Sequence, residues 1–487
     1  MNSATLPLPL GIPSAIHGER TDPPVSLVRL LVASVVLGAV VAVGAIAFLA
    51  ACEVMTSLAL AQCAGYQPGG PAGETVLVPP AVGGSLRVWL LVPIAMLGGL
   101  VSGWVTRRFA PEAGGTGSDA AIRAYYDVCS GPVHIRVSVV KILATALTIG
   151  TGGSGGREGP MIQVGGGMGS WLAGWFGFGP AGRRVLLAAG MGAAVAAVFR
   201  SPLGGTLFAA EVLNRSEEIE SEVLIPAGTA ALTAHVTAGA VLGWGPVLPA
   251  SYAPFATPLH LAAFALLALV LVVLARLYVL LHHRTSGWFA RLAVPEAVKP
   301  ALGAGLAAII GVSLYFAAGR DEHALAVLGF GLGTLQQILT QPDNFSAGLL
   351  IALALGKLVT TPLTVYSGGS GGVFGPALII GGCGGGALGL LLQPLGPQWV
   401  PPPTAFLLVG MAGFFAAAAK TPFSTLLIVC ELTGGFGLIA PALGVCVGCF
   451  LLSGRDSLFD SQPAHRTDPS VQDSSGCPSK VTASPAE

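Results

Sequence analysis

Lys141–Pro160 reads KILATALTIGTGGSGGREGP, and Lys357–Pro376 reads KLVTTPLTVYSGGSGGVFGP. The second stretch is a copy of the first, with the same glycine run and the same Gly-Pro end. A second related pair follows these two, namely Met191–Val212 and Met411–Leu432. The chain therefore consists of two related halves, each built around a glycine-rich break in apolar sequence.

The composition is that of a membrane protein. The chain has 487 residues, of which 53% are hydrophobic and only 9% are charged, whereas soluble domains carry about 25% charged residues. A membrane-spanning helix needs roughly 20 apolar residues. Four uncharged stretches meet that length: Leu30–Cys52, Val88–Thr106, Ala301–Gly319 and Ala377–Gly396. The net charge is zero, which gives no indication of a nucleic-acid or other polyanionic partner.

Polar segments mark the two ends of one transmembrane domain, residues 25–459. Residues 1–24 are polar and contain proline, which predicts a cytoplasmic N-terminal arm. Within the domain, repeat one covers residues 25–242 and repeat two covers residues 258–459. Residues 460–487 are Ser-rich and short of apolar side chains, a composition that predicts a disordered tail.

The apolar runs are unequal in length and are cut by Gly and Pro. Broken helices are tolerated inside a membrane only where protein or a water-filled cavity satisfies their exposed backbone groups. Repeated halves with interrupted helices are typical of a transporter whose site lies at the midplane, where the halves meet. We therefore expect an all-α polytopic membrane protein. Counting partial helices leaves open whether the repeat is inverted.

Gly155–Pro160 has the features of a helix start inside the membrane. Glycine permits unusual backbone conformations, and proline suits the first turn because its missing N–H would be unpaired there anyway. A helix that begins at about Glu158 would present free N–H groups and roughly half a positive charge, which attract an anion. Gly371–Pro376 repeats this start, and Ser201-Pro202 and Thr421-Pro422 each offer a hydroxyl cap. If these starts converge, they form a site for a small anion such as chloride.

The two copies differ at the tip of the break, where Arg157-Glu158 is replaced by Val373-Phe374. Ionisable residues inside a membrane are rare and usually functional, so a carboxylate present in one half alone is a candidate gate. Deprotonated, Glu158 would occupy the anion pathway. Protonated or displaced by chloride, it would swing away. The alternative is an ordinary acidic residue that interacts with the helix dipole.

Three pairs of charged residues recur in both halves at matching positions. Charges shared by both copies fit structural pairing at helix ends better than a step that is unique to one half. We assign this structural role to Glu211 and Glu431, Lys141 and Lys357, and Arg200 and Lys420.

Other functions have weaker support. An intramembrane serine protease would need a histidine facing Ser154 or Ser370, and only His235 lies deep in an apolar run. A carrier for organic substrates is compatible with the composition, although the helix starts suit small anions better. Cys446 and Cys449 have metal-motif spacing but lie in an apolar run without histidine. We expect these two cysteines to pack in the interior rather than bind a metal.

Around its two glycine-rich breaks, the chain resembles the CLC family of chloride channels and chloride–proton antiporters. Gly156–Pro160 reproduces the family's GREGP motif, Gly372–Pro376 fits its GxFxP motif, and Lys141 sits at the family's spacing before GREGP. The resemblance covers about residues 26–460. It implies an inverted repeat of tilted, broken helices in a multi-pass protein of the cell or inner membrane, with both termini in the cytoplasm. It implies no cofactor, no metal and no enzymatic activity.

The resemblance also assigns roles to single residues. Glu158 matches the gating glutamate. The backbone N–H groups of Val373 and Phe374 match the central anion ligands, and those of Arg157, Glu158 and Gly159 match the outer anion site. The transported partners would be chloride and, in an exchanger, protons. A homodimer is implied, with its contact around residues 202–242 and 422–452.

Three positions depart from the family's pattern. The family's first motif matches best at Gly115–Asp119, where Thr116 replaces the serine whose hydroxyl faces the ion. Phe459 aligns with the ion-facing tyrosine, so one hydrogen bond worth about 0.5–1.5 kcal/mol is lost. Val212 stands where many antiporters carry the internal proton acceptor, and valine cannot relay a proton. We therefore expect a passive chloride channel gated by Glu158, with chloride–proton exchange as the alternative.

Overall fold

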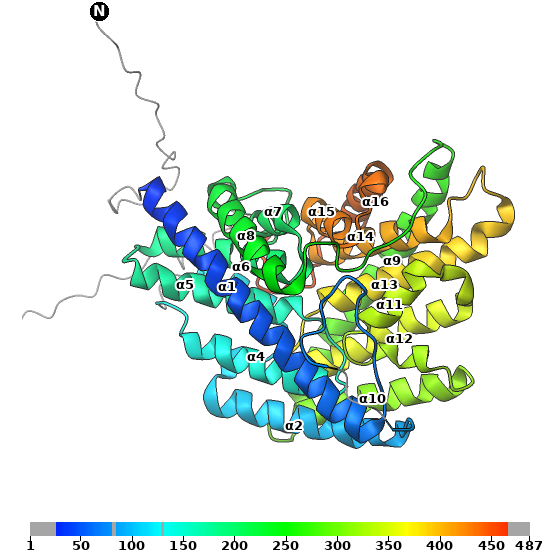
Figure 1. Ribbon diagram of the computed structural model, residues 1–487, viewed down its shortest axis with the longest axis horizontal. Coiled ribbons are helices and arrows are strands. Elements are labelled where there is room, and N and C mark those ends of the chain that lie inside the picture. The colour runs from blue at the N-terminus through cyan, green and yellow to red at the C-terminus, as the bar shows by residue number, and fades with distance from the viewer. Residues whose placement is uncertain (1–25, 80–83, 128–130, 466–487) are drawn as a thin grey trace, which may run out of the picture.

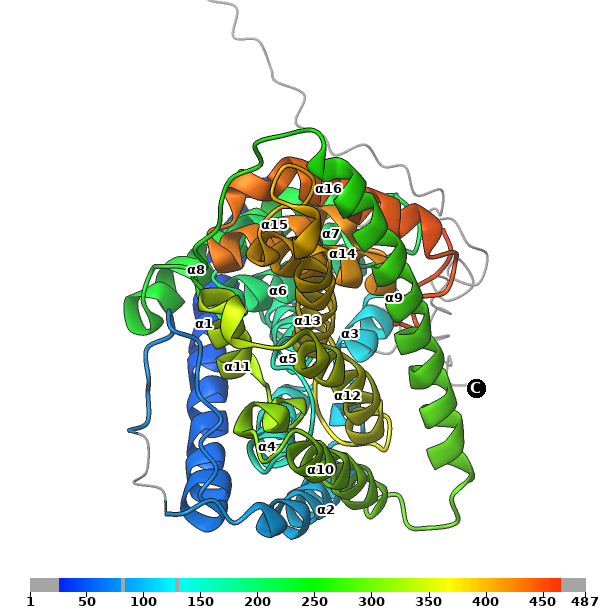
Figure 2. The same cartoon turned by 90° about the vertical axis from the view of Figure 1, so that its right-hand side faces the viewer.

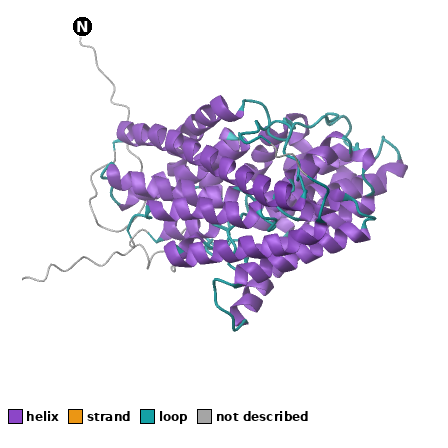
Figure 3. Cartoon of the chain, turned by 60° about the horizontal axis from the view of Figure 1, so that its bottom comes forward, coloured by secondary structure: helices purple, strands orange, loops and turns teal. Residues whose placement is uncertain are grey.

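The structure, a computed structural model, describes residues 26–79, 84–127 and 131–465, and the regular elements of these residues are helices (Figures 1 and 3). The first half contains α1 (Leu27–Thr56), α2 (Leu91–Phe109), α3 (Ser118–Tyr126), α4 (Ile135–Gly150), α5 (Glu158–Trp175), α6 (Pro180–Phe199), α7 (Pro202–Glu211) and α8 (Ser221–Leu242). The second half contains α9 (His260–Arg291), α10 (Lys299–Ala317), α11 (Leu332–Thr340), α12 (Ala347–Val365), α13 (Phe374–Leu392), α14 (Pro403–Ala419), α15 (Pro422–Thr433) and α16 (Ile439–Leu452). A π-helix, η1 (Ser57–Ala64), continues α1. The short 3-10 helices are η2 (Val88–Leu90), η3 (Pro111–Ala113), η5 (Glu322–Val327), η6 (Pro342–Asn344), η7 (Gln393–Leu395) and η8 (Phe436–Leu438).

The described residues include eight helices that are long and apolar enough to cross a membrane. The four uncharged stretches predicted to span fall mainly within α1, α2, α10 and α13. The other long helices are α6, α8, α9 and α12. The prediction of an all-α polytopic membrane protein is therefore confirmed. The predicted N-terminal arm, residues 1–24, lies outside the described residues, as does most of the predicted tail.

The two halves correspond helix by helix and are related as an inverted repeat. In Figure 1 the first half, coloured blue to green, lies mainly on the left, and the second half lies mainly on the right. Equivalent helices pack across the boundary between the halves, as α2 does on α10, α5 on α13 and α7 on α15 (Figure 2). The antiparallel bridge between Gly156 and Gly372 has the geometry that a two-fold axis between the halves would produce.

Close packing of glycine-bearing helices fixes the position of both helix starts. A Cβ atom on Gly165 of α5 would collide with the backbone carbonyl of Gly190 in α6, and a Cβ atom on Gly190 would collide with the carbonyl of Gly165. Gly381 of α13 and Gly410 of α14 repeat this contact in the second half. Small residues let membrane helices approach closely enough for extensive van der Waals contact, so α6 and α14 act as rigid supports for α5 and α13.

A charged residue in a left-handed conformation separates each supporting helix from the short helix that follows it. Arg200 ends α6 with φ 53°, and Lys420 ends α14 with φ 61°. This conformation is unfavourable for residues other than glycine. Arg200 compensates by donating to the carbonyls of Gly73 and Gly245, both at 2.8 Å, and Lys420 donates to Gly454 O at 2.7 Å. The predicted structural role of these two cations is confirmed.

The N-termini of α7 and α15 are capped by carboxylates from the opposite half. Glu431 accepts from the Ser201 hydroxyl at 2.5 Å and from Gly204 N at 2.9 Å. Glu211 accepts from Phe423 N at 3.0 Å and from Ser424 N at 2.7 Å. The predicted helix-end role of both glutamates is thus confirmed.

Two expectations about α7 and α15 are wrong. Ser201 and Thr421 do not cap their own helices by side-chain hydrogen bonds. The Ser201 hydroxyl donates to the Glu431 carboxylate instead. A carboxylate also already neutralises the positive end of each helix, so these two starts do not join the others in forming an anion site. The local cap rule failed because a charged acceptor from the other half is a stronger partner than a hydroxyl.

Lys141 and Lys357 are fully buried and hold backbone carbonyls that would otherwise lack partners. The Lys141 ammonium donates to Ala113 O at 3.0 Å and to Gly115 O at 2.8 Å, in the loop before α3. Lys357 donates to Gly329 O at 2.8 Å, in the loop before α11. Each lysine therefore fixes the entry to a short helix in its own half, as the structural prediction required.

The chain remains packed beyond residue 459. Ser461 donates its backbone N–H and its hydroxyl to Asp119 at 2.8 and 2.9 Å. Gln462 is buried, and its amide donates to Val212 O at 2.7 Å. The predicted start of the disordered tail, residue 460, is therefore too early in the chain. Composition did not reveal that polar side chains here would find buried backbone partners.

Candidate anion site

Two glycine-rich loops meet near the middle of the molecule and bring two helix starts together. Gly156 N donates to Gly372 O at 2.7 Å, and Gly372 N donates to Gly156 O at 2.7 Å. Two residues beyond these glycines, α5 begins at Glu158 and α13 begins at Phe374. The helix starts predicted from the two sequence copies are thus confirmed, and their N-termini are neighbours.

Hydroxyl groups tie each loop to the opposite half. Ser154 Oγ lies 3.0 Å from Thr361 Oγ1, and Ser370 Oγ lies 2.7 Å from the equivalent Thr145 Oγ1. Within the described residues neither serine is hydrogen-bonded to a histidine, and the ring of His235 packs against Trp244 instead. The serine and histidine that a protease would require are therefore not brought together.

The Glu158 carboxylate occupies the N-terminus of α13. The side chain is only 2% exposed, and its Oε1 accepts from Phe374 N at 2.6 Å. An anion at this place interacts with an otherwise unpaired N–H group and with the positive end of the helix dipole. Glu158 thus lies at the start of the second copy, which carries phenylalanine at the equivalent position. Its carboxylate therefore partners a helix-start N–H group from the other half.

A small cavity surrounds this carboxylate, and we call it the central cavity. Its volume is about 10 Å³, which is close to the minimum that holds one water molecule. Its wall consists mainly of apolar side chains from both halves, so an ion here would be shielded from bulk water. The lining residues are Ser118, Glu158, Ile162, Val195, Phe199, Phe208, Val373, Phe374, Phe415, Ile428 and Phe459.

Four of the predicted site residues line the central cavity: Glu158, Val373, Phe374 and Phe459. Thr116 does not, and the residue of this motif that does is Ser118. Gly117 has a φ of 81°, and α3 begins directly after it at Ser118. This left-handed glycine turns the chain between the two hydroxyl residues. Motif alignment alone missed Ser118, although a serine followed by an acid is a common helix-start signal.

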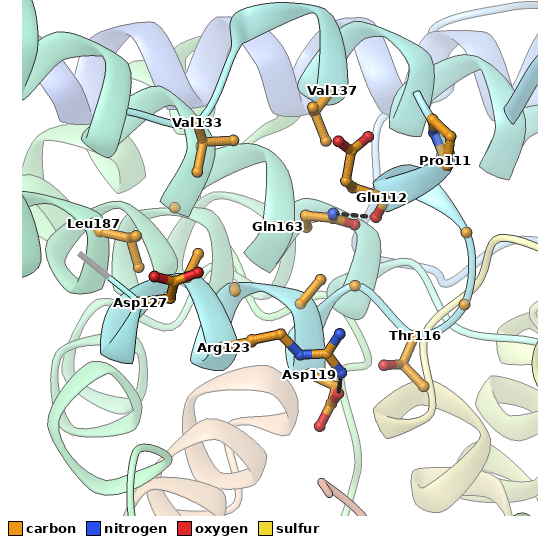
Figure 4. Close-up of a pocket in the computed structure, with 18 of the residues that line it drawn as sticks. Pro111, Glu112, Thr116, Asp119, Arg123, Asp127, Val133, Val137, Gln163 and Leu187 are labelled. Atoms are coloured by element: carbon orange, nitrogen blue, oxygen red, sulfur yellow. Dashed lines mark hydrogen bonds and ion pairs between the residues drawn. The ribbon is translucent and has the colours of Figure 1, made fainter. Parts of the chain in front are cut away.

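A larger cavity, which we call the vestibule, lies alongside α3 (Figure 4). Its volume is about 550 Å³, and it is lined by polar residues that include Thr116, Asp119, Arg123, Gln163 and Tyr366. The Gln163 amide donates to Glu112 O at 2.7 Å, and Arg123 pairs with Asp119 at 3.1 Å. Thr116 and Ser118 therefore face two different cavities across one turn of backbone.

Arg157 and Gly159 flank the gate candidate without lining the central cavity. Arg157 is buried and forms an ion pair with Glu74 at 2.7 Å, and its guanidinium lies 5.9 Å from the centre of the Phe199 ring. A Cβ atom on Gly159 would collide with Thr116 O. Glycine is thus required where α5 passes the loop before α3. Glu74 was not identified from sequence, because it lies in an irregular Gly- and Pro-rich loop.

Val212 is fully buried at the end of α7, and its carbonyl accepts the Gln462 amide at 2.7 Å. No ionisable side chain occupies this position. Neighbouring Glu211 points to the start of α15, where it is held by Phe423 and Ser424. The acid next to Val212 is therefore already committed to a structural role.

Substituting Gly156 by alanine is expected to evict the Glu158 carboxylate. A Cβ atom on Gly156 would overlap that carboxylate, which is the mobile end of a flexible side chain, and Gly156 does not have a positive φ. A carboxylate at a helix start is stabilised by up to about 2 kcal/mol. Losing this stabilisation should raise chloride flux at alkaline pH by about tenfold and make the flux less dependent on pH. Chloride efflux from liposomes, recorded at several pH values, measures both effects.

Gly174→Ala is the matched control, because Gly174 lies on α5 with nothing within 4 Å of an added Cβ. It should retain the pH dependence of the unaltered protein. If Gly156→Ala also retained that dependence, the carboxylate would not be resting against Gly156 during transport.

Comparison with known proteins places the chain among ion transporters. A model of the voltage gated chloride channel family matches residues 98–454. The H(+)/Cl(-) exchange transporter ClcA of Salmonella paratyphi A is 31% identical over 374 residues, which is 75% of this chain and 77% of that protein. ClcA of Salmonella agona is 30% identical over 377 residues, with the same coverage.

Solved structures support the fold. A slow cyanobacterial Cl-/H+ antiporter has a TM-score of 0.73 and 24% identity, covering 88% of this chain and 96% of that one. A CLC-type fluoride/proton antiporter has a TM-score of 0.70 and 21% identity, covering 90% of this chain and 98% of that one. The inverted repeat of broken helices is thus a known transporter fold.

Proposed function

Since this chain belongs to the CLC family, that of the voltage gated chloride channel, we propose that it moves chloride across a membrane in exchange for protons. One observation carries the proposal, namely the Glu158 carboxylate bound to Phe374 N at the start of α13. A proton-binding group and the position for a free anion coincide there. The relatives with about 30% identity are exchange transporters by name, which further supports exchange.

Competition for one position couples the two ions. While Glu158 is charged, it satisfies the α13 N-terminus and leaves no room for chloride in the central cavity. When it takes up a proton, the carboxyl loses its charge and most of its attraction to the helix dipole. Chloride can then replace it at the N–H groups of Val373 and Phe374, beside Ser118 and Phe459. The departing carboxyl carries its proton with it.

The proposed chloride pathway runs along α6. Leu187 lines the vestibule, Val195 and Phe199 line the central cavity, and Arg200 holds the loop that contains Glu74. At 1.5 Å per residue, Leu187 and Arg200 are about 20 Å apart. The pathway thus passes from the vestibule to Glu158 and leaves past the Arg157–Glu74 pair. The backbone N–H groups from Arg157 to Gly159 form the outer binding position.

The vestibule is proposed to face the cytoplasm, with both termini on that side. Asp460, near the C-terminal end of the described residues, lines the vestibule. We also propose that the protein is a homodimer in the cell or inner membrane, with its contact around residues 202–242 and 422–452. Exposed apolar side chains of the contact segments, among them Leu232, Val236, Phe423 and Leu443, support this contact.

Exchange is favoured over the passive channel expected from the sequence. That expectation rested on Val212, which removes one known place for an internal proton acceptor. Valine at position 212 leaves the proton-binding group Glu158 in place, and the named relatives are exchangers. The absence of an acid at one position therefore indicates a different proton route more than a loss of coupling.

An outward proton gradient should drive chloride into liposomes that contain the purified protein. The vesicles are loaded at acidic pH, the membrane potential is clamped at zero with potassium and valinomycin, and radioactive chloride is followed. An exchanger should accumulate chloride above its external concentration, because protons leaving the vesicle drive its entry. A passive channel would only equilibrate chloride, and that result would contradict exchange. No chloride flux at all would contradict chloride transport.

A further inference from the structure

We propose that His282 of α9 relays protons between the vestibule and Glu158, in place of the carboxylate that Val212 excludes. This inference rests on the proposed exchange of chloride for protons. The route it describes depends on three contacts of His282: its hydrogen bond to Tyr278, the link from Tyr278 to the Glu158 site, and its packing against Tyr366.

His282 is a buried base with a fixed tautomer. The residue is 1% exposed within a membrane-spanning helix, where ionisable groups are rare. Its Nδ1 lies 2.6 Å from Tyr278 O. A carbonyl oxygen can only accept a hydrogen bond, so Nδ1 carries a hydrogen, and Nε2 of the neutral ring carries a lone pair. Nε2 has no hydrogen-bond partner among the described residues and is therefore free to take up a proton.

On one side, Tyr278 connects His282 to the anion site. The two rings are in contact, with their centres 4.0 Å apart. The Tyr278 hydroxyl donates to Val373 O at 3.3 Å. That carbonyl belongs to the same peptide group as Phe374 N, which donates to Glu158 at 2.6 Å. A single peptide group thus lies between the tyrosine hydroxyl and the gate carboxylate, and hydrogen bonds in such a chain polarise one another.

On the other side, Tyr366 connects His282 to the vestibule. The ring centres of His282 and Tyr366 are 4.8 Å apart, nearly perpendicular. Tyr366 lines the vestibule together with Asp119 and Asp460. His282 therefore lies between the vestibule, whose wall is shown in Figure 4, and the start of α13, where the Glu158 carboxylate is bound.

Charged groups lie on both sides of His282 and act on its protonation in opposite directions. On its own helix, His283 is paired with Asp460 of the C-terminal segment at 3.4 Å. Tyr366 faces the ring from the end of α12, and Glu158 lies beyond Tyr278 near the start of α13. The two acids attract a proton to this region, whereas a charged His283 would oppose it. Among the residues that the structure describes, no carboxylate is in direct contact with His282, so an imidazolium here can release its proton again.

The transfer consists of two steps that conserve protons. A hydronium ion in the vestibule releases a proton and becomes water, and the proton passes Tyr366 to bind Nε2, which leaves His282 positively charged. The Nε2–H bond then breaks, and the proton passes Tyr278 to the Glu158 carboxylate, where an O–H bond forms, so both groups become neutral. The uncharged carboxyl leaves the start of α13, and chloride takes its place.

Substituting His282 by asparagine is the main test. The asparagine amide can still donate to Tyr278 O, but it offers no base. Uphill proton movement should fall at least tenfold, while chloride flux in liposomes stays within about threefold of the unaltered protein, since Glu158 can still take up a proton from the opposite end of the pathway and no proposed chloride contact involves His282. Both fluxes are recorded together with chloride and pH electrodes. His282→Gln serves as a second variant if asparagine prevents folding.

His260→Asn is the matched control. His260 is also buried on α9, and its Nε2 lies 3.0 Å from the carbonyl of Pro397. This variant should keep both fluxes. Unchanged proton coupling in His282→Asn would overturn the relay, while exchange in the unaltered protein would still stand. If the unaltered protein moved chloride without protons, the proposed exchange itself would fail, and the relay with it.

Discussion

Replacing Glu158 by glutamine is expected to abolish proton movement while chloride continues to flow. Glutamine has the same shape as glutamate, but it cannot bind or release a proton at any pH used. It also carries no charge, and the α13 N-terminus stabilises a carboxylate by up to about 2 kcal/mol. Chloride should therefore displace the glutamine side chain more easily than the carboxylate, and its flux should become independent of pH.

Proton and chloride electrodes recording from the same liposome suspension measure both effects. Glu217→Gln is the matched control, because Glu217 is exposed in the loop after α7, and it should behave as the unaltered protein does. Proton movement that persisted in Glu158→Gln would show that the coupling group lies elsewhere. Unchanged pH dependence of chloride flux would remove the gate role as well.

Replacing Glu211 by alanine is expected to cause a large loss of stability. Glu211 is 3% exposed and accepts three hydrogen bonds from the start of α15, including one from the Ser424 hydroxyl at 2.5 Å. Removal leaves two backbone N–H groups and one hydroxyl without their partner. A buried donor left without a partner typically costs about 1–3 kcal/mol, and three such donors are left here. The apparent Tm in detergent should fall by several degrees.

Two further variants separate this effect from a general loss of charge. Glu431→Ala removes the equivalent cap from α7 and should also lower the apparent Tm. Glu217→Ala removes an exposed carboxylate and should change stability by no more than about 0.5 kcal/mol. If Glu211→Ala melted at the temperature of the unaltered protein, the cross-half cap would contribute little, and α15 would be held by packing alone.

The repeat explains why so much of the fold follows from the sequence. Two copies of a glycine-rich break fix where α5 and α13 begin, and the two-fold relation brings those starts together. The contact between Glu158 and the start of the second copy follows from this symmetry. Local features were sufficient here because glycine and proline act within a few residues of their own position.

The details that escaped sequence analysis depend on contacts between distant segments. Ser118 replaces Thr116 in the central cavity because of a single left-handed glycine. The caps of α7 and α15 come from the opposite half, and no local rule predicts them. Gln462 is ordered by a carbonyl of Val212 far away in the chain.

A liposome experiment that starts at equal pH on both sides tests the central claim most directly. Vesicles that contain the purified protein are loaded with high chloride and diluted into low chloride, and external pH is followed with the potential clamped at zero. The account predicts that chloride efflux draws protons into the vesicles, so that the medium becomes alkaline against the growing proton gradient. Chloride efflux without this alkalinisation would contradict exchange and support the passive channel first expected from Val212.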